Sequence, residues 1–584
     1  MYRFTFVFFS IILHLSASGN CFVSEDKKEE VLMSERVYLN TDRKVYIAGE
    51  NLYFSFYLID NKVKALVSYS SIGYVYIKDV KAEVIGRSQI KVLQGKGSGA
   101  IYLSDTLKTG YYEIVGYTNF MRNGSPEVFF KSQILVANRF DKDFSGLLFA
   151  NTISDTAVVK EPLNPSEKSQ PIYLQPVKPV FGKRERVGIK LNLKDTDIKS
   201  ASLTISVVEK NSAEANQMLN QKKIARNSKG IIVNTSAGNI NPIYLAEDKY
   251  AELLGQVTDE NNYGLAYHVL YLTSSDTTTN FKYAVSDSKG YFRFPLSDFY
   301  SGKELFIKMK QNEGESITPK ITVNSKYNYR EGFTPQGWSI DSSLINYLRN
   351  SQDIVRILKS YAHIQSIHRP KKFLTVAPLL FKVPDFKVIP SEYTELKDFH
   401  EISREIIPAL KIRKHNQSYE AEILDIKNGR YMQPKPLVFL DGVMIDDISQ
   451  VVSFGSRDIK KIELISSEWM ADHQKFQGVL SIFSNNNLWR NVILNSNNVR
   501  LRHEAFFEVP PLYSPDYSVT DVKGRDPDFR QVLYWNPDLE IVSGKTFEID
   551  FFTSDYAGNY LIKVSGVTDK GDIIEAYSEI VVNE

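Results

Sequence analysis

Residues 434–487 read PKPLVFLDGVMIDDISQVVSFGSRDIKKIELISSEWMADHQKFQGVLSIFSNNN, and the rest of the chain is organised around them. The short apolar run Leu437–Leu440 stops at Asp441 and Gly442, which form one of the strongest turn dipeptides. Apolar residues resume at Val443 and continue to Ile445. This pattern predicts a β-hairpin with Asp441 and Gly442 as its structural turn.

The second half of the stretch predicts a short helical segment and two more strands. Asp446 and Asp447 offer oxygens that can cap the helical segment, and strands follow at Ile459–Ile465 and Gly478–Phe483. The "PLVFLDGV" hairpin, the "DIKKIELI" strand and the final "GVLSIFS" resemble the plug domain of TonB-dependent outer-membrane receptors. The resemblance implies a small α/β plug-like domain, which we place at residues 385–487.

Composition favours several β-rich domains. A chain of 584 residues is too long to fold around one hydrophobic core. Because domains typically have about 100 to 200 residues, we expect roughly four to five domains. The 34 Tyr and 34 Phe favour strands. The formal net charge of +2 gives no clustered basic field, so we expect no nucleic-acid partner.

The N-terminus predicts export. Arg3 precedes an apolar run from Phe4 to Leu15, too short for a comfortable bilayer crossing of about 20 residues, so residues 1–20 are interpreted as a signal peptide. Cys21 follows directly and is a candidate for lipid attachment. Asn20 departs from the small residue that normally precedes a lipidated cysteine, so lipid anchoring at Cys21 and plain cleavage near it both stay open. The expected location is the periplasm or outer membrane of a Gram-negative bacterium, with membrane contact only through such an anchor.

Residues 34–138 predict a first β-sandwich, since apolar and polar residues alternate through several short runs. Its "YLNTDRKVYIAGENLYFSFYL" resembles the second macroglobulin domain of the alpha-2-macroglobulin family. We interpret Asp42 and Arg43 as a structural pair at a strand start. A linker is expected at 139–169; Asp141 opens an EF-hand-like loop there, but Thr152 stands where the bidentate Glu is required.

Two further sandwiches are predicted in the middle of the chain. Residues 170–248, with a long polar insertion, resemble another macroglobulin-type domain. Residues 249–326 resemble the carboxypeptidase regulatory-like domain, a transthyretin-like sandwich that carries no catalysis. His268 alternates there with apolar residues and is interpreted as a strand side chain.

Residues 327–384 are expected to be a helical linker. A helix is predicted over 341–364, and His363 and His368 near its end do not share a helical face. Further on, His400 and Glu401 begin like a zinc-protease helix, but Arg404 stands where that motif needs its second histidine.

The last predicted domain, residues 488–584, is a third macroglobulin-like sandwich. Its Tyr534 and Trp535 could stack on a sugar face, but large aromatics in a strand are usually core. The predicted fold class is therefore mainly β: tandem β-sandwiches, macroglobulin-like and transthyretin-like, with one small α/β plug-like domain.

These features predict a non-enzymatic cell-envelope protein that binds or scaffolds other envelope proteins, with an outer-membrane TonB-dependent transport system as one partner class. Residues 488–584 look like one soluble sandwich rather than a transporter barrel, so transport by this chain alone is excluded. A covalent protease trap is excluded because its thioester needs a cysteine beyond Cys21. A non-covalent protease-interacting protein and a glycan-active enzyme with dispersed carboxylates stay open as alternatives. No catalytic residue, cofactor or metal ligand is predicted.

Overall fold

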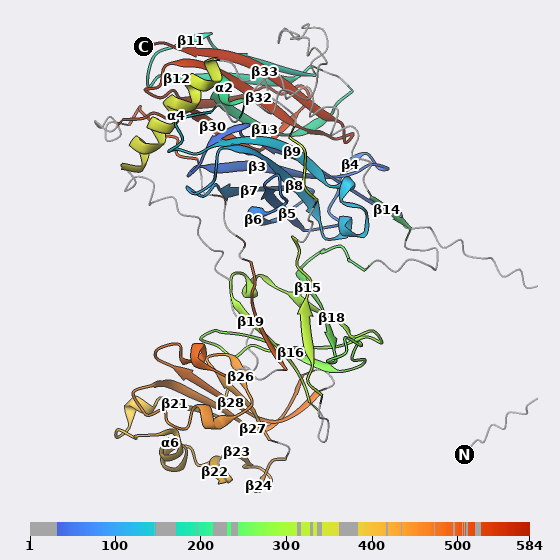
Figure 1. Ribbon diagram of the computed structural model, residues 1–584, viewed down its shortest axis with the longest axis vertical. Coiled ribbons are helices and arrows are strands. Elements are labelled where there is room, and N and C mark those ends of the chain that lie inside the picture. Colours follow the sequence, from blue (N-terminus) through green and yellow to red (C-terminus); the bar gives the residue numbers. More distant parts are fainter. Residues whose placement is uncertain are drawn as a thin grey trace, which may run out of the picture.

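The computed structural model describes the parts of the chain that follow: 32–144, 147, 171–194, 197–213, 231–234, 243–311, 317–327, 331–335, 342–360, 383–415, 418–433, 435–471, 474–493, 497–504, 506, 509, 512–519 and 527–584. Figure 1 shows two bodies along the long axis of the molecule. The upper body holds the two sandwiches A and B, and the lower body holds sandwich C and an α/β unit. Strands make up 49% of the described residues and helices 12%, which confirms the mainly β fold class. Among the described residues, no helix is both long and apolar enough to cross a membrane.

Sandwich A is built from two five-stranded sheets. The strands of its first sheet are β14 (Ile231–Asn234), β1 (Leu32–Thr41), β3 (Asn51–Asp60), β4 (Ala65–Leu66) and β7 (Lys96–Tyr102). Those of its second sheet are β2 (Val45–Ile47), β9 (Phe130–Ala137), β8 (Gly110–Thr118), β5 (Ile72–Lys78) and β6 (Val84–Lys91). Strand β3 is buried at nearly every position, because one of its faces lies on the core of sandwich A and the other faces sandwich B. At the contact with sandwich B, the Tyr57 and Thr204 hydroxyls are 2.8 Å apart.

Sandwich B corrects the predicted domain division. Its strands are β10 (Ile172–Pro176), β12 (Arg186–Leu193) and β31 (Phe547–Phe552) in one sheet, and β11 (Val180–Phe181), β33 (Ile573–Val582), β32 (Gly558–Thr568), β13 (Ser200–Glu209) and β30 (Val532–Val542) in the other. Both neighbours of β13 come from the end of the chain. Segments 170–248 and 488–584 were predicted as two separate sandwiches. In the structure each of the two sheets contains strands from both segments, so the segments fold together as one sandwich.

Sandwich C is also closed by a strand from far along the chain. Its sheets contain β18 (Tyr291–Leu296), β15 (Ala251–Thr258) and β20 (Lys320–Val323), and β17 (Lys282–Val285), β16 (Val269–Ser274), β19 (Glu304–Met309) and β29 (Asn498–Arg502). Strand β29 pairs with β19 although the whole α/β unit lies between them in sequence. The α/β unit is thus inserted into sandwich C, and sandwich C is inserted into sandwich B between β13 and β30.

The α/β unit has one five-stranded sheet and one small sheet. The large sheet orders β21 (Phe386–Val388), β27 (Ile459–Ala471), β28 (Gln474–Ser484), β25 (Leu437–Leu440) and β26 (Val443–Ile445). The small sheet contains β22 (Leu410–His415), β23 (Ser418–Asp425) and β24 (Arg430–Tyr431). Helix α6 (Phe399–Ile406) begins where the Asp398 carboxylate accepts a hydrogen bond from the Glu401 amide at 2.8 Å.

Helix α4 (Ser342–Ser360) lies within the range predicted for it, but it is more than a linker. Its Leu344, Tyr347 and Leu348 pack in one cluster with Val45 and Leu135 of sandwich A, next to the short helix α2 (Lys210–Ala213). The chain therefore passes between the bodies from β14 to β15, from β20 to α4, from α4 to β21 and from β29 to β30 (Figure 1).

Short 3₁₀ helices complete the described secondary structure: η1 (Phe120–Asn123), η2 (Pro126–Val128), η4 (Asp298–Tyr300), η6 (Pro390–Glu392), η7 (Ile448–Gln450) and η8 (Leu488–Asn491).

Candidate functional site

Asp441 and Gly442 form the two-residue turn between β25 and β26. Both have positive φ, 49° and 83°, as a type I′ hairpin turn requires. The buried Asp441 carboxylate accepts hydrogen bonds from the Ser484 amide and hydroxyl, both at 2.6 Å, and from the Trp489 amide at 3.3 Å. The turn is therefore tied to the end of β28 and to η8.

The same turn is the point where the α/β unit contacts sandwich C. The Asp276 amide donates to the Asp441 carbonyl at 2.9 Å. A Cβ added to Gly442 would lie 2.6 Å from the Ser274 carbonyl oxygen, so only glycine allows the two backbones to approach this closely. An ion pair between Lys308 and Asp446 adds a second contact.

An aromatic cluster fills the rest of this contact, which we call the α/β joint. Phe439 is fully buried, and its ring lies 6.5 Å from that of Phe281 in an edge-to-face arrangement. Phe281 also meets the Trp469 ring at 5.9 Å, and Trp469 stacks on Phe476 at 5.2 Å. Sandwich C and the α/β unit thus share one apolar core.

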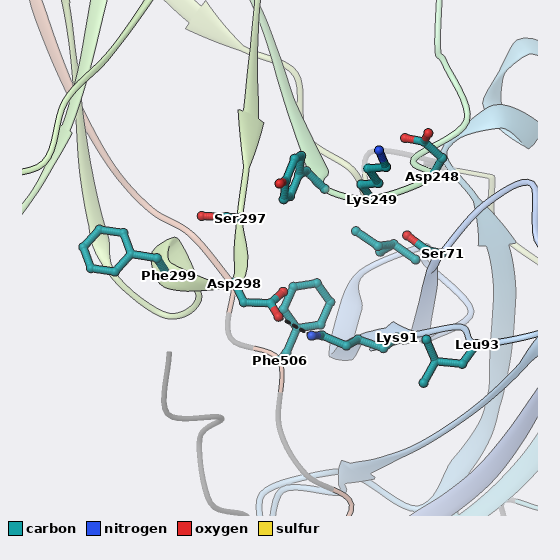
Figure 2. Close-up of a pocket in the computed structure, with 11 residues that line it drawn as sticks. Ser71, Lys91, Leu93, Asp248, Lys249, Ser297, Asp298, Phe299 and Phe506 are labelled. Carbon is teal, nitrogen blue, oxygen red and sulfur yellow. Dashed lines mark hydrogen bonds and ion pairs between the residues drawn. The ribbon is translucent and has the colours of Figure 1, made fainter. Parts of the chain in front are cut away.

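A cavity of about 380 Å³ lies where the two bodies meet, and we call it the junction pocket. Figure 2 shows residues of sandwich A on one side and residues of the lower body on the other. The lining residues are Ser71, Ile72, Lys91, Leu93, Asp248, Lys249, Tyr250, Ser297, Asp298, Phe299 and Phe506.

The pocket combines apolar walls with a charged rim. Lys91 pairs with Asp298 across the two bodies, and its ammonium lies 5.7 Å from the centre of the Phe506 ring (Figure 2). Residues 243–250, which lead into β15, form a segment that we call the strap. Asp248 and Lys249 are exposed on the strap, and neither pairs with another residue that the structure describes. Leu93 is 69% exposed at the opposite side.

Behind the pocket, buried polar groups hold the strap against sandwich A. The Glu247 carboxylate accepts from the Tyr74 hydroxyl at 2.7 Å and from the Lys326 ammonium at 2.9 Å. Glu35 lies in the same buried region and accepts from the Ser70 hydroxyl at 2.8 Å. Burial raises the pKa of Glu35 to about 7, and the nearby Glu247 charge adds to the effect.

Asp42 and Arg43 are placed as a buried structural pair. The Asp42 carboxylate accepts from the Tyr46 hydroxyl at 2.7 Å and from the Tyr53 amide at 3.1 Å. The Arg43 guanidinium lies 2.9 Å from Glu50. These contacts fix the start of sandwich A.

The other residues singled out in the sequence do not gather into one site. His268 was interpreted as a strand side chain, but it lies just before β16, and its Nδ1 is 2.9 Å from the Ala266 carbonyl oxygen. Asp447 caps η7 through the Ser449 amide at 2.8 Å, and Trp535 is buried in β30. No group of three or more His, Cys, Asp or Glu among the described residues could hold a metal ion.

Several predicted features lie outside the described residues. These are the signal peptide 1–20, Cys21, Thr152, His363 and His368.

The pocket residues were not predicted from the sequence. Lys91, Asp298 and Phe506 come from three segments that lie far apart in the chain, and none belongs to a motif. Only the fold brings them together.

Comparisons with known proteins identify no family. No family model matches the sequence, and no curated protein matches it. Among solved structures, the chain is similar to Salmonella alpha-2-macroglobulin reacted with methylamine, with 8% identity, 94% of this chain and 39% of that chain covered, and a TM-score of 0.23. Trypsin-activated alpha-2-macroglobulin from Escherichia coli gives 8% identity, coverages of 94% and 42%, and a TM-score of 0.24. The Escherichia coli adhesin FdeC gives 11% identity, coverages of 50% and 65%, and a TM-score of 0.16.

The chain spans about two fifths of the length of these bacterial alpha-2-macroglobulins. The TM-scores are too low to carry a functional argument. The resemblances of residues 385–487 to a receptor plug and of residues 249–326 to a regulatory-like domain stay predictions.

Proposed function

We propose that this protein is a non-enzymatic binding or scaffolding component of the cell envelope, and that the junction pocket receives a segment of a partner protein. The observation that carries the proposal is the place of the pocket, which both bodies line. A partner held there contacts sandwich A and the lower body at once.

The chemistry of the pocket fits a polypeptide segment. Leu93 and Tyr250, which are 69% and 51% exposed, offer apolar surface that an aliphatic or aromatic side chain can cover. Ile72, Phe299 and Phe506 lie buried beneath them in the pocket lining. At the rim, Lys249 and Asp248 are free to pair with charged groups that flank such a side chain, because no other described residue engages them. Binding sites of this kind draw most of their affinity from a few buried apolar contacts, while the charged rim adds specificity.

The nested connectivity supports a scaffolding role. The chain passes between the bodies repeatedly, so the lower body cannot separate without breaking the polar contacts at the junction. A partner segment in the pocket would add contacts to both sides and hold the bodies in one relative orientation. The protein would then fix the geometry of whatever each body binds.

The envelope location and the finer partner class rest on the sequence. The signal peptide over residues 1–20 and Cys21 after it support export and attachment at a membrane. The resemblance of residues 385–487 to a receptor plug supports an outer-membrane TonB-dependent transporter as the partner.

The test is chemical crosslinking in cells of the source bacterium, followed by purification of the full-length protein. Leu93→Arg places a charge at the mouth of the pocket, where Leu93 is 69% exposed. Val63→Arg is the matched control, because Val63 is 67% exposed on sandwich A but does not line the pocket.

We expect the wild-type protein and the Val63→Arg variant to recover the same envelope protein, and the Leu93→Arg variant to lose it. Equal recovery by both variants, or no partner with the wild-type protein, contradicts the proposal. If the recovered protein is not an outer-membrane transporter, only the finer proposal fails.

A further inference from the structure

A buried amine and a buried carboxamide meet at the interface between sandwiches A and B. Tyr38 and Asn40 point from β1 toward sandwich B, and Lys563 and Ser565 point from β32 toward sandwich A. Each pair shares one face of its strand, because residues two apart in a strand lie on the same side. The Tyr38 and Ser565 hydroxyls are 2.6 Å apart, so the two strands also make contact beside the Lys563–Asn40 pair.

The Lys563 ammonium donates to the Asn40 side-chain oxygen at 2.5 Å. The two residues are only 3% and 2% exposed. The oxygen that accepts this hydrogen bond is bonded to the carboxamide carbon, so the lysine amine lies beside the carbonyl group that an amine would attack.

A buried carboxyl group stands beside the pair. Glu575 lies on β33, opposite Ser565 and therefore diagonally across the ladder from Lys563. Its carboxylate accepts from the Tyr577 hydroxyl at 2.8 Å and from the Tyr38 hydroxyl at 3.2 Å, so its position is fixed. Among the charges that act on Lys563, that of Glu575 has the largest effect.

Burial also prepares the amine as a nucleophile. Removal from water lowers the pKa of Lys563, which increases the fraction of neutral amine with a free electron pair. The same site holds the electrophile and the carboxyl group, and it excludes the water that would compete with the amine.

We propose that Lys563 and Asn40 react to form an intramolecular isopeptide bond between sandwiches A and B. The bond would be a covalent modification site that joins the beginning of the chain to its end. The inference is independent of the function proposed above.

The reaction balances without an added reagent. The neutral Lys563 nitrogen adds to the side-chain carbonyl carbon of Asn40, and a new C–N bond forms. Glu575 takes one proton from the lysine nitrogen and delivers it to the amide nitrogen of Asn40. The bond from the carbon to that nitrogen then breaks, and one ammonia molecule leaves; no atom is oxidised or reduced.

A second buried lysine at this interface provides a control. Lys44 is only 2% exposed, and its ammonium donates to the Ser132 hydroxyl at 2.9 Å. Its hydrogen-bond partner is a hydroxyl group, which has no carbonyl carbon for an amine to attack. Burial alone therefore does not distinguish Lys563 from Lys44; the carboxamide partner does.

Peptide mapping by mass spectrometry of the purified full-length protein tests the proposal. Trypsin should release residues 37–43 joined to residues 546–570, because the modified Lys563 resists cleavage. The joined species should weigh one ammonia molecule less than the two peptides together. Lys563→Met should abolish it, and Lys44→Met should leave it in place.

Glu575→Gln tests the role of the carboxyl group. The amide cannot carry the proton, while its oxygen can accept from one tyrosine hydroxyl and its NH2 group can donate to the other. We therefore expect at least a tenfold slower appearance of the joined peptide after synthesis. A wild-type protein that yields only the linear peptides 37–43, 546–563 and 564–570, even after prolonged incubation, overturns the proposal. An unchanged rate in Glu575→Gln overturns the role of Glu575.

Discussion

The contact inside the lower body and the contact between the lower and upper bodies differ in chemistry. The α/β joint is built from buried groups: Phe439 is fully buried, and Asp441 in the hairpin turn is only 7% exposed. The junction between the bodies also has buried contacts, such as the edge-to-face pair of Tyr74 and Tyr327, but part of it consists of ion pairs at partly exposed positions. Lys91 and Asp298 form one such pair, and their side chains are 35% and 39% exposed. Exposed ion pairs contribute about 0–1 kcal/mol each and are screened by salt, whereas buried aromatic contacts are not.

The difference implies two levels of rigidity. Sandwich C and the α/β unit should move as one body, because separating them exposes a shared core. The upper and lower bodies should change their relative orientation more easily, because exposed ion pairs make up part of their contact beside the buried cluster. A ligand in the junction pocket should restrict that motion.

The largest effect on stability is expected from a substitution that leaves a cavity in the α/β joint. Phe439→Ala should lower the free energy of unfolding of the lower body by about 3–5 kcal/mol, because it leaves a cavity in a closed aromatic cluster. Hydrogen exchange at the amides of β16 and β28 would measure it. Tyr263→Ala, at a site 73% exposed on sandwich C, should cost less than about 0.5 kcal/mol. Equal effects of the two changes would show that the joint is not a shared core.

A pH-dependent effect of similar size is expected on the upper side of the junction. Burial raises the pKa of Glu35 to about 7, above its value of 4.5 in the unfolded chain, so the folded state binds more protons between these pH values. Stability should therefore fall as pH rises from about 4.5 to 7, by on the order of 3 kcal/mol in total.

Glu35→Gln removes this ionisation beside Glu247 and Asp60. We expect the variant to gain stability over the wild type at pH 8 and to gain little at pH 5, as measured by denaturant unfolding of the upper body. If the stability of the wild-type protein rises through this pH range, burial does not raise the pKa of Glu35.

Removing the carboxylate of the hairpin turn should have a smaller effect. Asp441→Ala leaves the Ser484 and Trp489 donors without their acceptor, at a cost of about 2 kcal/mol. Thermal unfolding monitored by near-UV circular dichroism would report the loss. Asp287→Ala is the control, since Asp287 accepts from the Lys289 and Tyr291 amides at an exposed turn. A cost at Asp287 as large as that at Asp441 would remove the special role of the joint.

The smallest effect is expected at the rim of the junction pocket. Lys91→Met breaks the pair with Asp298 and should cost less than about 1 kcal/mol. The difference from wild type should disappear in high salt, when unfolding is measured at two ionic strengths. A cost that persists at high salt would mean that packing of the Lys91 stem on Phe506, rather than charge, holds the junction.

Local structure could be predicted from the sequence where one short pattern decides it. The Asp441–Gly442 turn follows from the dipeptide and its flanking apolar runs, and α4 follows from its helical period. The burial of Trp535 follows from its place in an alternating strand.

The nested arrangement could not be predicted. The alternation of apolar and polar residues predicts β13 and β30 as strands but does not indicate which strands they pair with. In the structure they pair with each other although more than half of the chain separates them. The same holds for β29 and β19. The junction pocket and the Lys563–Asn40 pair depend on these long-range pairings, so no local pattern could indicate them.

Distances between spin labels would test the two-level rigidity most directly. Cys21, the only cysteine, is replaced by serine, and cysteines are placed at exposed positions: Val63 in sandwich A, Tyr263 in sandwich C and Ile426 in the α/β unit. The account predicts that the distribution between positions 63 and 263 broadens from low to high salt, while that between 263 and 426 stays narrow. A distribution between 263 and 426 that broadens as much as the other, or one between 63 and 263 that salt leaves unchanged, would contradict it.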